Sequence, residues 1–246
     1  WTKNHYLMYM HEIAAPDLEK SLTEDLKKLK SYIPVQHITG MAQFFGLTLK
    51  VNQHVLIPRP ETEELVQLIL DTYLNPPAGI LDLCSGSGCI ALALKQKYPA
   101  AKVEGYEWSR EALQLSEENA SLLKLDVAFQ HQDVLNLNSQ VEQWDCIVSN
   151  PPYISSEEAK QMEKQVLNHE PQMALFPEGD NPLIFYERIA LFAKESLVYG
   201  GWVFAEINQY LAEKTRDLFM EQGFTPEVIK DINGNNRMIK AQKNHA

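Results

Sequence analysis

A short apolar run, a glycine-rich turn and a helix start follow one another in residues 80–91, which read ILDLCSGSGCIA. Gly86 and Gly88 permit positive φ and a close approach of the backbone to a ligand. The helix that begins behind them offers free backbone N–H groups at its N-terminus. In open α/β sheets such a turn lies at the carboxyl edge of the strands, where ligands bind. The stretch therefore predicts both a sheet and a binding site at its edge.

Strand-like and helix-like patterns alternate from residue 61 to the C-terminal end. The expected strands are 79–83, 102–107, 126–130, 144–149, 202–207, 227–231 and 237–241, and the expected helices are 61–74, 89–97, 111–123, 183–197 and 211–222. This alternation predicts an α/β fold, with a mostly parallel seven-stranded sheet covered by helices on both faces. Residues 232–236 contain an Asn-Gly turn and no helix, so we expect the last strand to be antiparallel. Residues 150–182 are expected to be rich in loops.

The first 60 residues differ from the rest of the chain. Apolar residues recur at helical spacing, with Pro16 and Asp17 placed as a helix start. They are Leu18, Leu22, Leu26, Leu29 and Ile33. The expected amphipathic helix cannot bury its own apolar face and has to pack on something. Residues 35–57 are rich in β-branched and aromatic residues, which predicts a hairpin. We therefore divide the chain into a partial helical domain (1–33), a hairpin linker (34–60) and a sheet domain (61–246).

Composition narrows the class of protein. The chain has 246 residues, with 22 Lys and Arg against 33 Asp and Glu, and a net charge of −11. Because affinity for a phosphate backbone comes from clustered positive charge, this balance disfavours a direct nucleic-acid partner. No apolar run approaches about 18 residues, so no membrane span is expected. Cys84, Cys89 and Cys146 form neither a CxxC pair nor an even framework, which indicates a reducing compartment, the cytoplasm, and no metal site.

A second motif, Asn150-Pro151-Pro152-Tyr153, ends the strand expected at 144–149. Two prolines stop the strand, so the chain turns out at the carboxyl edge and places Asn150 beside the glycine turn. The Asn150 side chain and the Pro151 carbonyl then form two convergent acceptors, and Tyr153 can cover a planar group. Two acceptors suit the N–H groups of an amide or aromatic amine, whose nitrogen is a poor nucleophile until hydrogen bonding raises its electron density. The motif predicts group transfer to a planar NH₂ group.

The spacing of the residues alone does not decide which ligand the glycine turn binds. Gly86-x-Gly88-x-x-Ala91 satisfies a loose dinucleotide fingerprint. Glu107 ends the next strand, where it can accept hydrogen bonds from ribose hydroxyls. Asp82-x-x-x-Gly86-x-Gly88 also resembles the first motif of S-adenosylmethionine-dependent methyltransferases. A nicotinamide-dependent oxidoreductase is one alternative, but it leaves the second motif without a role. A catalytically silent binding module is another, which the intact second motif disfavours.

Over nearly its whole length, the sequence resembles the release-factor glutamine N5-methyltransferases of the HemK/PrmC family. The segments that carry the resemblance are QHITG (36–40), Phe44-Phe45, LIPRPETE (56–63), the Asn150 turn, HEP (169–171), Ala174-Leu175 and Asp231-x-Asn233-Gly234-Asn235-x-Arg237. The resemblance implies a class I, Rossmann-like methyltransferase domain at 61–246, with S-adenosylmethionine as cofactor and S-adenosylhomocysteine as product. It implies that the helical N-terminal portion helps to hold the substrate, which is the glutamine of the Gly-Gly-Gln loop of peptide-chain release factors in translation termination. An adenine-N6 methyltransferase acting on DNA or RNA is the alternative, since its target is also a planar NH₂ group.

The resemblance also implies roles for individual residues, and a monomeric enzyme is expected. The catalytic residues are expected to be Asn150, Pro151 and Tyr153, and the substrate residues are these three with Pro152 and Arg59. The cofactor residues are expected to be Asp82, Cys84, Gly86, Gly88, Glu107, Trp108, Asp133, Val134 and Asn150. Arg59 has an alternative interpretation as the surface ion-pair partner of Glu61 or Glu63. Cys84 and Asn181-Pro182 both stand where the family pattern has a glycine.

Overall fold

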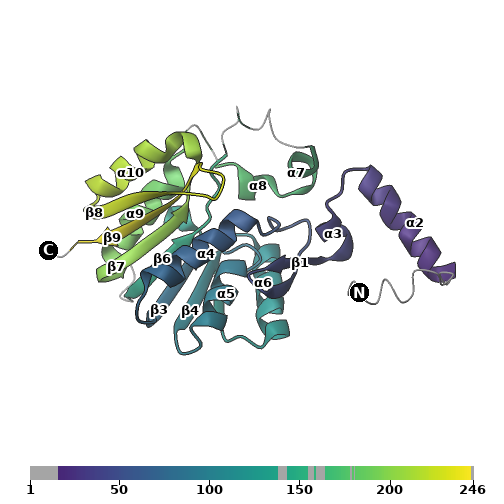
Figure 1. Cartoon of the computed structure of the whole chain (residues 1–246), viewed down its shortest axis with the longest axis horizontal. Helices are drawn as coiled ribbons and strands as arrows, with labels where there is room; N and C mark the ends of the chain where they lie inside the picture. Colours follow the sequence, from purple (N-terminus) through teal and green to yellow (C-terminus); the bar gives the residue numbers. More distant parts are fainter. Residues whose placement is uncertain are drawn as a thin grey trace.

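The computed structural model describes residues 16–137, 143–154, 158, 164–177, 179 and 181–244. Its centre is a seven-stranded sheet (Figure 1). The strand order is β5 (Ala128–His131), β4 (Lys102–Glu107), β3 (Gly79–Leu83), β6 (Trp144–Ser149), β7 (Leu197–Glu206), β9 (Asn236–Lys243) and β8 (Phe224–Lys230). β9 is antiparallel to both neighbours, and the other pairs are parallel. The mostly parallel sheet and its antiparallel last strand are confirmed.

Helices cover both faces of the sheet, as the alternation predicts. On one face lie α4 (Pro60–Thr72), α5 (Cys89–Lys97) and α6 (Arg110–Leu123), and on the other lie α9 (Ile184–Ser196) and α10 (Ala212–Glu221) (Figure 1). Successive side chains along a strand point to opposite faces, so each strand serves both layers. Leu81 and Ile147 are fully buried in the α9 layer, whereas Ile80 and Cys146 are fully buried in the α4–α5 layer. The core is therefore continuous on both sides of the central strands.

The ends of the elements follow the sequence pattern closely in the centre of the sheet. The predicted ranges 79–83, 89–97, 102–107 and 144–149 coincide with β3, α5, β4 and β6. β7 begins at Leu197 rather than Trp202, directly after α9. The expected loop region contains two short helices that were not predicted, α7 (Lys164–His169) and α8 (Gln172–Leu175). Helices of this length hold too few residues to show a periodic pattern.

The buried side chain of Asn119 is one of several contacts that hold the hairpin against the sheet domain. The hairpin itself is confirmed as β1 (Met41–Phe44) and β2 (Leu47–Lys50), and a short helix that was not predicted, α3 (Val35–Thr39), precedes it. Asn119 in α6 accepts from the Lys50 N–H at 2.8 Å through Oδ1. Its Nδ2 donates to the carbonyls of Lys50 and Ser87, at 3.1 and 3.0 Å. Asn119 thus connects the hairpin to the glycine turn.

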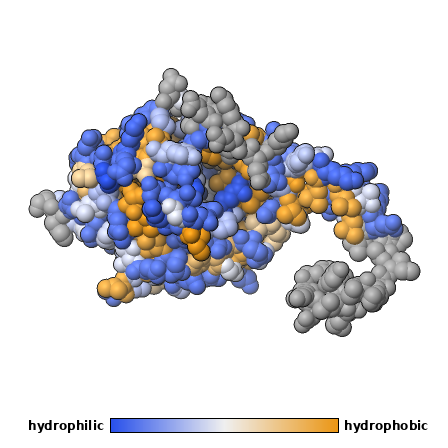
Figure 2. Space-filling model, turned by 45° about the horizontal axis from the view of Figure 1, so that its top comes forward, coloured by the Kyte–Doolittle hydropathy of each residue, from blue (hydrophilic) through white to orange (hydrophobic). Residues whose placement is uncertain are grey.

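α2 (Pro16–Lys30) begins where the sequence predicts but stands away from the sheet domain (Figure 1). Leu22, Leu26 and Leu29 are 51%, 56% and 44% exposed, and Figure 2 shows apolar side chains along this part of the surface. The expectation that this face packs on another element is therefore not met within the described residues. None of the described helices combines the length and the apolar character that crossing a bilayer requires.

Candidate active site

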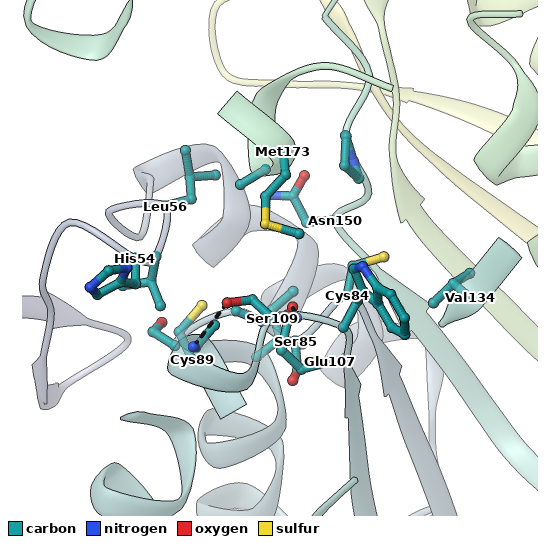
Figure 3. A pocket seen from close by; sticks show the side chains of 18 of the residues that line it. His54, Leu56, Cys84, Ser85, Cys89, Glu107, Ser109, Val134, Asn150 and Met173 are labelled. Atoms are coloured by element: carbon teal, nitrogen blue, oxygen red, sulfur yellow. Dashed lines mark hydrogen bonds between the residues drawn. The ribbon is translucent and has the colours of Figure 1, made fainter. Parts of the chain in front are cut away.

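A cavity of about 370 Å³ opens at the carboxyl edge of the sheet, where β3 and β6 end (Figure 3). The chain winds outward in opposite directions from these two strands, which is the position where open α/β sheets bind ligands. Residues from the glycine turn, from the ends of β4 and β5, from the Asn150 turn and from the segment after β2 line it. In Figure 3, Asn150 and Met173 lie together on one side of the cavity, and Ser85 and Glu107 lie across from them.

The glycine turn keeps its shape through left-handed φ angles. Gly88 is the N-cap of α5 with φ 78°, and a Cβ at this position would lie only 2.7 Å from Cζ of Phe129. Both the backbone conformation and the packing therefore require glycine. Gly86 lines the cavity, but Gly88 does not in the described structure. This arrangement gives Gly88 a packing role next to the cavity.

Cys84 lines the cavity in a conformation that disfavours its side chain. Its φ is 61°, in the left-handed region. That region costs a residue with a Cβ about 1–2 kcal/mol. The strain gives a physical reason for a glycine at this position of the family pattern, from which this chain departs.

Two buried carboxyl groups hold the turn. Asp82 is fully buried, and its Oδ2 accepts from the N–H of Ala91 at 3.1 Å. Glu107 accepts from the N–H groups of Gly86 and Ser109, each at 2.8 Å. Burial raises the pKa of the Glu107 carboxyl, against the lowering effect of these N–H groups. Glu107 lines the cavity and can accept hydrogen bonds from ligand hydroxyls, whereas Asp82 supports the turn from beneath.

The aromatic side chain of Trp108, directly after Glu107, forms one side of the cavity. Trp108 is 54% exposed and stacks on His131 with the ring centroids 5.0 Å apart. Asp133 accepts from the Leu135 N–H at 2.9 Å and so caps a 3₁₀ turn, η1 (Val134–Asn136). Trp108, Asp133 and Val134 all line the cavity. An indole beside a carboxylate suits a planar base attached to a sugar.

The cavity also contains polar atoms without a partner among the described residues. The Oγ atoms of Ser85 and Ser87 are buried and make no hydrogen bond there. Buried hydroxyls in folded proteins are normally paired, so a partner outside the described residues, such as a ligand in the cavity, is expected for them. Together with the Glu107 carboxylate and the Trp108 ring, they match a nucleoside that carries a polar tail. The residues present fit the expected S-adenosylmethionine.

Asn150 leaves the sheet beside the glycine turn, as predicted. Leu83 and Ser149 are opposite each other in the β3–β6 pair, and the Ser149 hydroxyl donates to the Leu83 carbonyl at 2.8 Å. Asn150 lines the cavity, and its Nδ2 donates to Oγ1 of Thr62 at 3.3 Å. With Nδ2 engaged, the acceptor Oδ1 is the part of the amide available to a substrate.

The other residues of this turn have different surroundings. Pro152 lines the cavity, whereas Pro151 and Tyr153 do not in the described structure. The Tyr153 ring packs against the core layer of α9, and its hydroxyl lies 3.5 Å from Oε2 of Glu206. Asn208 donates to the Tyr153 carbonyl at 3.0 Å. A role of the Tyr153 ring in covering a substrate therefore stays a prediction.

Arg59 does not line the main cavity. Its guanidinium forms an ion pair with the buried Glu170, whose other oxygen accepts from the Ile57 N–H at 3.2 Å. The interpretation of Arg59 as a partner of Glu61 or Glu63 is therefore wrong. Arg59 also lines a second cavity of about 380 Å³ between α3, β1 and the start of α4. Its expected role in substrate binding stays a prediction.

Sequence reasoning missed the part of the cavity wall that follows Glu170. Met173, Ala174 and Phe176 line the cavity from α8 and its C-terminal end, and Phe185 lines it from α9. The available signal was the family-like sequence at 169–171 and 174–175, to which no role was given. The unusual Asn181-Pro182 lies directly before α9, and Asn181 Oδ1 accepts from the N–H of Leu183, the N-cap of that helix, at 3.0 Å. The neighbouring positions 178 and 180 lie outside the described residues.

Comparisons with known proteins agree with this geometry. The family model described as "Methyltransferase small domain" matches residues 62–211. A protein of Flavobacterium psychrophilum named "Release factor glutamine methyltransferase" is 40% identical, over 96% of this chain and 87% of its own length. A protein of Bacteroides thetaiotaomicron with the same name is 42% identical, over 92% of this chain and 81% of its own length.

Solved structures share the fold at lower identity. A methyltransferase from Pyrococcus furiosus has a TM-score of 0.62, with 94% of this chain and 100% of that chain covered. Its sequence identity is 15%, so the likeness shows the fold alone. With the strand order described above, it confirms the predicted class I methyltransferase fold.

Proposed function

Because the chain belongs to the release factor glutamine methyltransferase family, we propose that it methylates the side-chain amide nitrogen of a glutamine in peptide-chain release factors. The target glutamine is the one in the Gly-Gly-Gln motif, and the methyl donor is S-adenosylmethionine. The observation that carries the proposal is the orientation of Asn150. Its Nδ2 is held by Thr62, so the amide offers Oδ1 as an acceptor at the cavity, next to the glycine turn.

One group of cavity residues would bind the cofactor, and another would bind the substrate amide. Glu107 provides the carboxylate, and Ser85 and Ser87 provide hydroxyls, that would hold the cofactor, and Trp108 provides a ring for its base. When bound, the cofactor supplies an electrophilic sulfonium methyl group and leaves as S-adenosylhomocysteine. Asn150 would accept a hydrogen bond from the substrate NH₂ group and orient the nitrogen lone pair toward that methyl. The proton that the nitrogen loses passes to solvent.

Positioning accounts for most of the expected acceleration. Neither a metal ion nor a covalent intermediate is needed for transfer from a sulfonium, and alignment of two bound reactants contributes up to about 7–11 kcal/mol. The Gly86 turn and the Asn150 turn leave paired strands, β3 and β6, so the two ligands would meet at a fixed separation. Apolar residues such as Met173 and Phe176 border the same space and limit the access of water.

The proposed function also implies a cellular compartment, a class of substrate and a domain organisation. A release factor acts in translation, so the compartment is the cytoplasm. The net charge of −11 favours a protein substrate over direct binding of nucleic acid. We propose a monomeric enzyme in which residues 1–33 belong to a substrate-binding domain, 34–60 form the linker and 61–246 form the catalytic domain. The exposed leucines of α2 support a protein-binding role for the first of these.

A methyl-transfer assay tests the proposed activity. The chain is incubated with methyl-labelled S-adenosylmethionine and either a full-length release factor or duplex DNA. We expect the release factor to gain one label on the Gly-Gly-Gln glutamine, and the DNA to stay unlabelled. A release factor in which that glutamine is replaced by alanine is the matched control and is expected to stay unlabelled. Label on DNA, with none on the release factor, would show that the adenine-N6 alternative is correct.

A further inference from the structure

A chain of three polar side chains leads from the cavity into the core of the sheet domain. The Asn150 Nδ2 donates to Thr62 Oγ1 at 3.3 Å, and the Thr62 hydroxyl donates to Oε1 of Glu206. Thr62 lies in the first turn of α4, and Glu206 is the last residue of β7. Thr62 and Glu206 are each 2% exposed. Three segments far apart in the sequence therefore meet at one buried contact behind Asn150.

We propose that Thr62 and Glu206 are positioning residues that fix the side-chain amide of Asn150 with Oδ1 directed to the substrate. The inference rests on the proposed function, in which Asn150 accepts a hydrogen bond from the substrate amide. Neither residue carries out chemistry. Thr62 lines the cavity next to Asn150, whereas Glu206 does not line it in the described structure. Their effect on the reaction passes through Asn150.

The direction of the hydrogen bonds follows from what each group can do. An ionised carboxylate has acceptors only, so the hydroxyl of Thr62 has to donate to Glu206. The hydroxyl oxygen of Thr62 then presents a lone pair to Asn150. Asn150 can satisfy that lone pair only with its NH₂ group, which leaves Oδ1 on the other side. The buried Glu206 carboxylate thus determines that Oδ1 of Asn150, rather than Nδ2, faces the substrate.

The opposite orientation of the amide would oppose binding. With Nδ2 in the cavity, Asn150 would present donors to the substrate NH₂ group, which also has donors. The two ends of an asparagine amide have nearly the same shape, so packing alone does not distinguish them. A buried polar partner is therefore the means by which the fold can select one orientation.

Glu206 is itself held in place from several sides. The Tyr153 hydroxyl lies 3.5 Å from its second oxygen, and the Tyr186 hydroxyl donates to its backbone carbonyl at 3.1 Å. In β9, Met238 is paired with Glu206, and the adjacent Arg237 favours the ionised carboxylate electrostatically. Burial, together with a smaller effect of the Glu61 carboxylate, raises the pKa of Glu206 to about 7, so the acceptor-only form is populated from neutral pH upward. These contacts keep the carboxylate in position to accept from Thr62.

Substitutions of Thr62 separate positioning from support of the fold. Thr62→Val removes the hydroxyl and keeps the shape of the side chain, whereas Thr62→Ser keeps the hydroxyl. We expect Thr62→Val to lower kcat for release-factor methylation about 10- to 100-fold, less than the 10²–10³ typical of a group that contacts the reacting atoms. The KM for S-adenosylmethionine is expected to stay within about 2-fold of wild type. Thr62→Ser is expected to recover most of the lost kcat.

A matched control and a double variant complete the test. Thr72→Val changes a threonine at the other end of α4, whose hydroxyl donates to the Leu68 carbonyl of its own helix, and is expected to leave kcat unchanged. Added to Asn150→Ala, Thr62→Val is expected to cause no further loss of kcat, because a residue that acts through Asn150 has nothing left to position. Each variant is checked for folding by the increase of its Tm with S-adenosylhomocysteine. If Thr62→Val does not fold, Thr62→Ala replaces it in the same comparison.

The outcomes distinguish this inference from the proposed function. If the wild-type chain does not label the release factor, the proposed function is wrong. If the wild type is active and Thr62→Val retains its kcat, the positioning role is wrong while the function stands. A serine variant as impaired as the valine variant, or an undiminished effect of Thr62→Val in the Asn150→Ala background, would also overturn the positioning role.

Discussion

Replacing Gly88 by alanine tests the packing role of the glycine turn. Gly88 has φ 78°, and an added Cβ would lie 2.7 Å from Cζ of Phe129 and 3.1 Å from Cβ of Ser116. The left-handed backbone costs an alanine about 1–2 kcal/mol. Overpacking against an aromatic ring costs about 1–3 kcal/mol more. We therefore expect the free energy of unfolding to fall by about 3 kcal/mol, which lowers the Tm of a chain of this size by about 6–12 °C.

The measurement is urea unfolding of matched variants. Gly234→Ala is the control, because Gly234 has a similar φ of 83° but open space around the added Cβ. Its loss should be limited to the backbone cost, about 1 kcal/mol. Combining Gly88→Ala with Phe129→Leu should be less destabilising than the sum of the two single substitutions, because the shorter side chain frees space for the methyl group.

Two results would refute this reasoning. If Gly88→Ala destabilises no more than Gly234→Ala, the contact with Phe129 is not limiting. If the two substitutions at 88 and 129 are simply additive, they do not share a contact. In addition, S-adenosylhomocysteine should raise the Tm of Gly88→Ala as much as that of wild type, since Gly88 does not line the cavity in the described structure.

Three further predictions address the candidate site. Asn150→Ala should lower kcat by about 10²–10³-fold while S-adenosylhomocysteine still raises the Tm, and an equal loss of both would contradict a substrate role. Cys84→Gly should raise the free energy of unfolding by about 1 kcal/mol in urea titrations, because it relieves a left-handed φ of 61°. A decrease would mean that packing of the thiol outweighs the strain. Glu206 favours its protonated form in the folded chain, since its pKa rises from 4.5 to about 7. Its contribution to stability is therefore complete at low pH and decreases by about 3 kcal/mol as pH rises from the unfolded to the folded pKa. The kcat is expected to rise around the folded pKa of about 7, where the carboxylate forms in the folded chain. Unfolding of Glu206→Gln should lack this pH-dependent loss, and a constant difference from wild type would contradict the assignment.

The local sequence predicts the parts of the fold that local patterns control. β3, β4, β6 and α5 fall at their predicted residues because each is a continuous apolar run or a periodic stretch bounded by a turn. Asn150 is beside the glycine turn because β3 and β6 are adjacent, which follows from the order of strands in a doubly wound sheet. These results needed no knowledge of side-chain contacts.

Long-range side-chain partners could not be predicted in the same way. Arg59 pairs with Glu170, 111 residues along the chain, rather than with the nearby Glu61 or Glu63. Glu206 lies 144 residues from Thr62, and no local pattern relates them. The direction of the Tyr153 ring likewise depends on the core layer behind the turn. Such contacts follow from how the elements pack, so only the folded structure shows them.

The parallel pairing of β3 and β6 has a consequence for how the enzyme can change. Leu83 and Ser149 are directly opposite, so the turns that follow them leave the sheet at the same level, about 4.8 Å apart. That separation is set by backbone hydrogen bonds, which side-chain substitutions leave intact. Mutations around the cavity can therefore alter which molecules bind, and how tightly, without changing the distance between these two turns. The spacing of the two turns and the choice of ligand can therefore change independently in evolution.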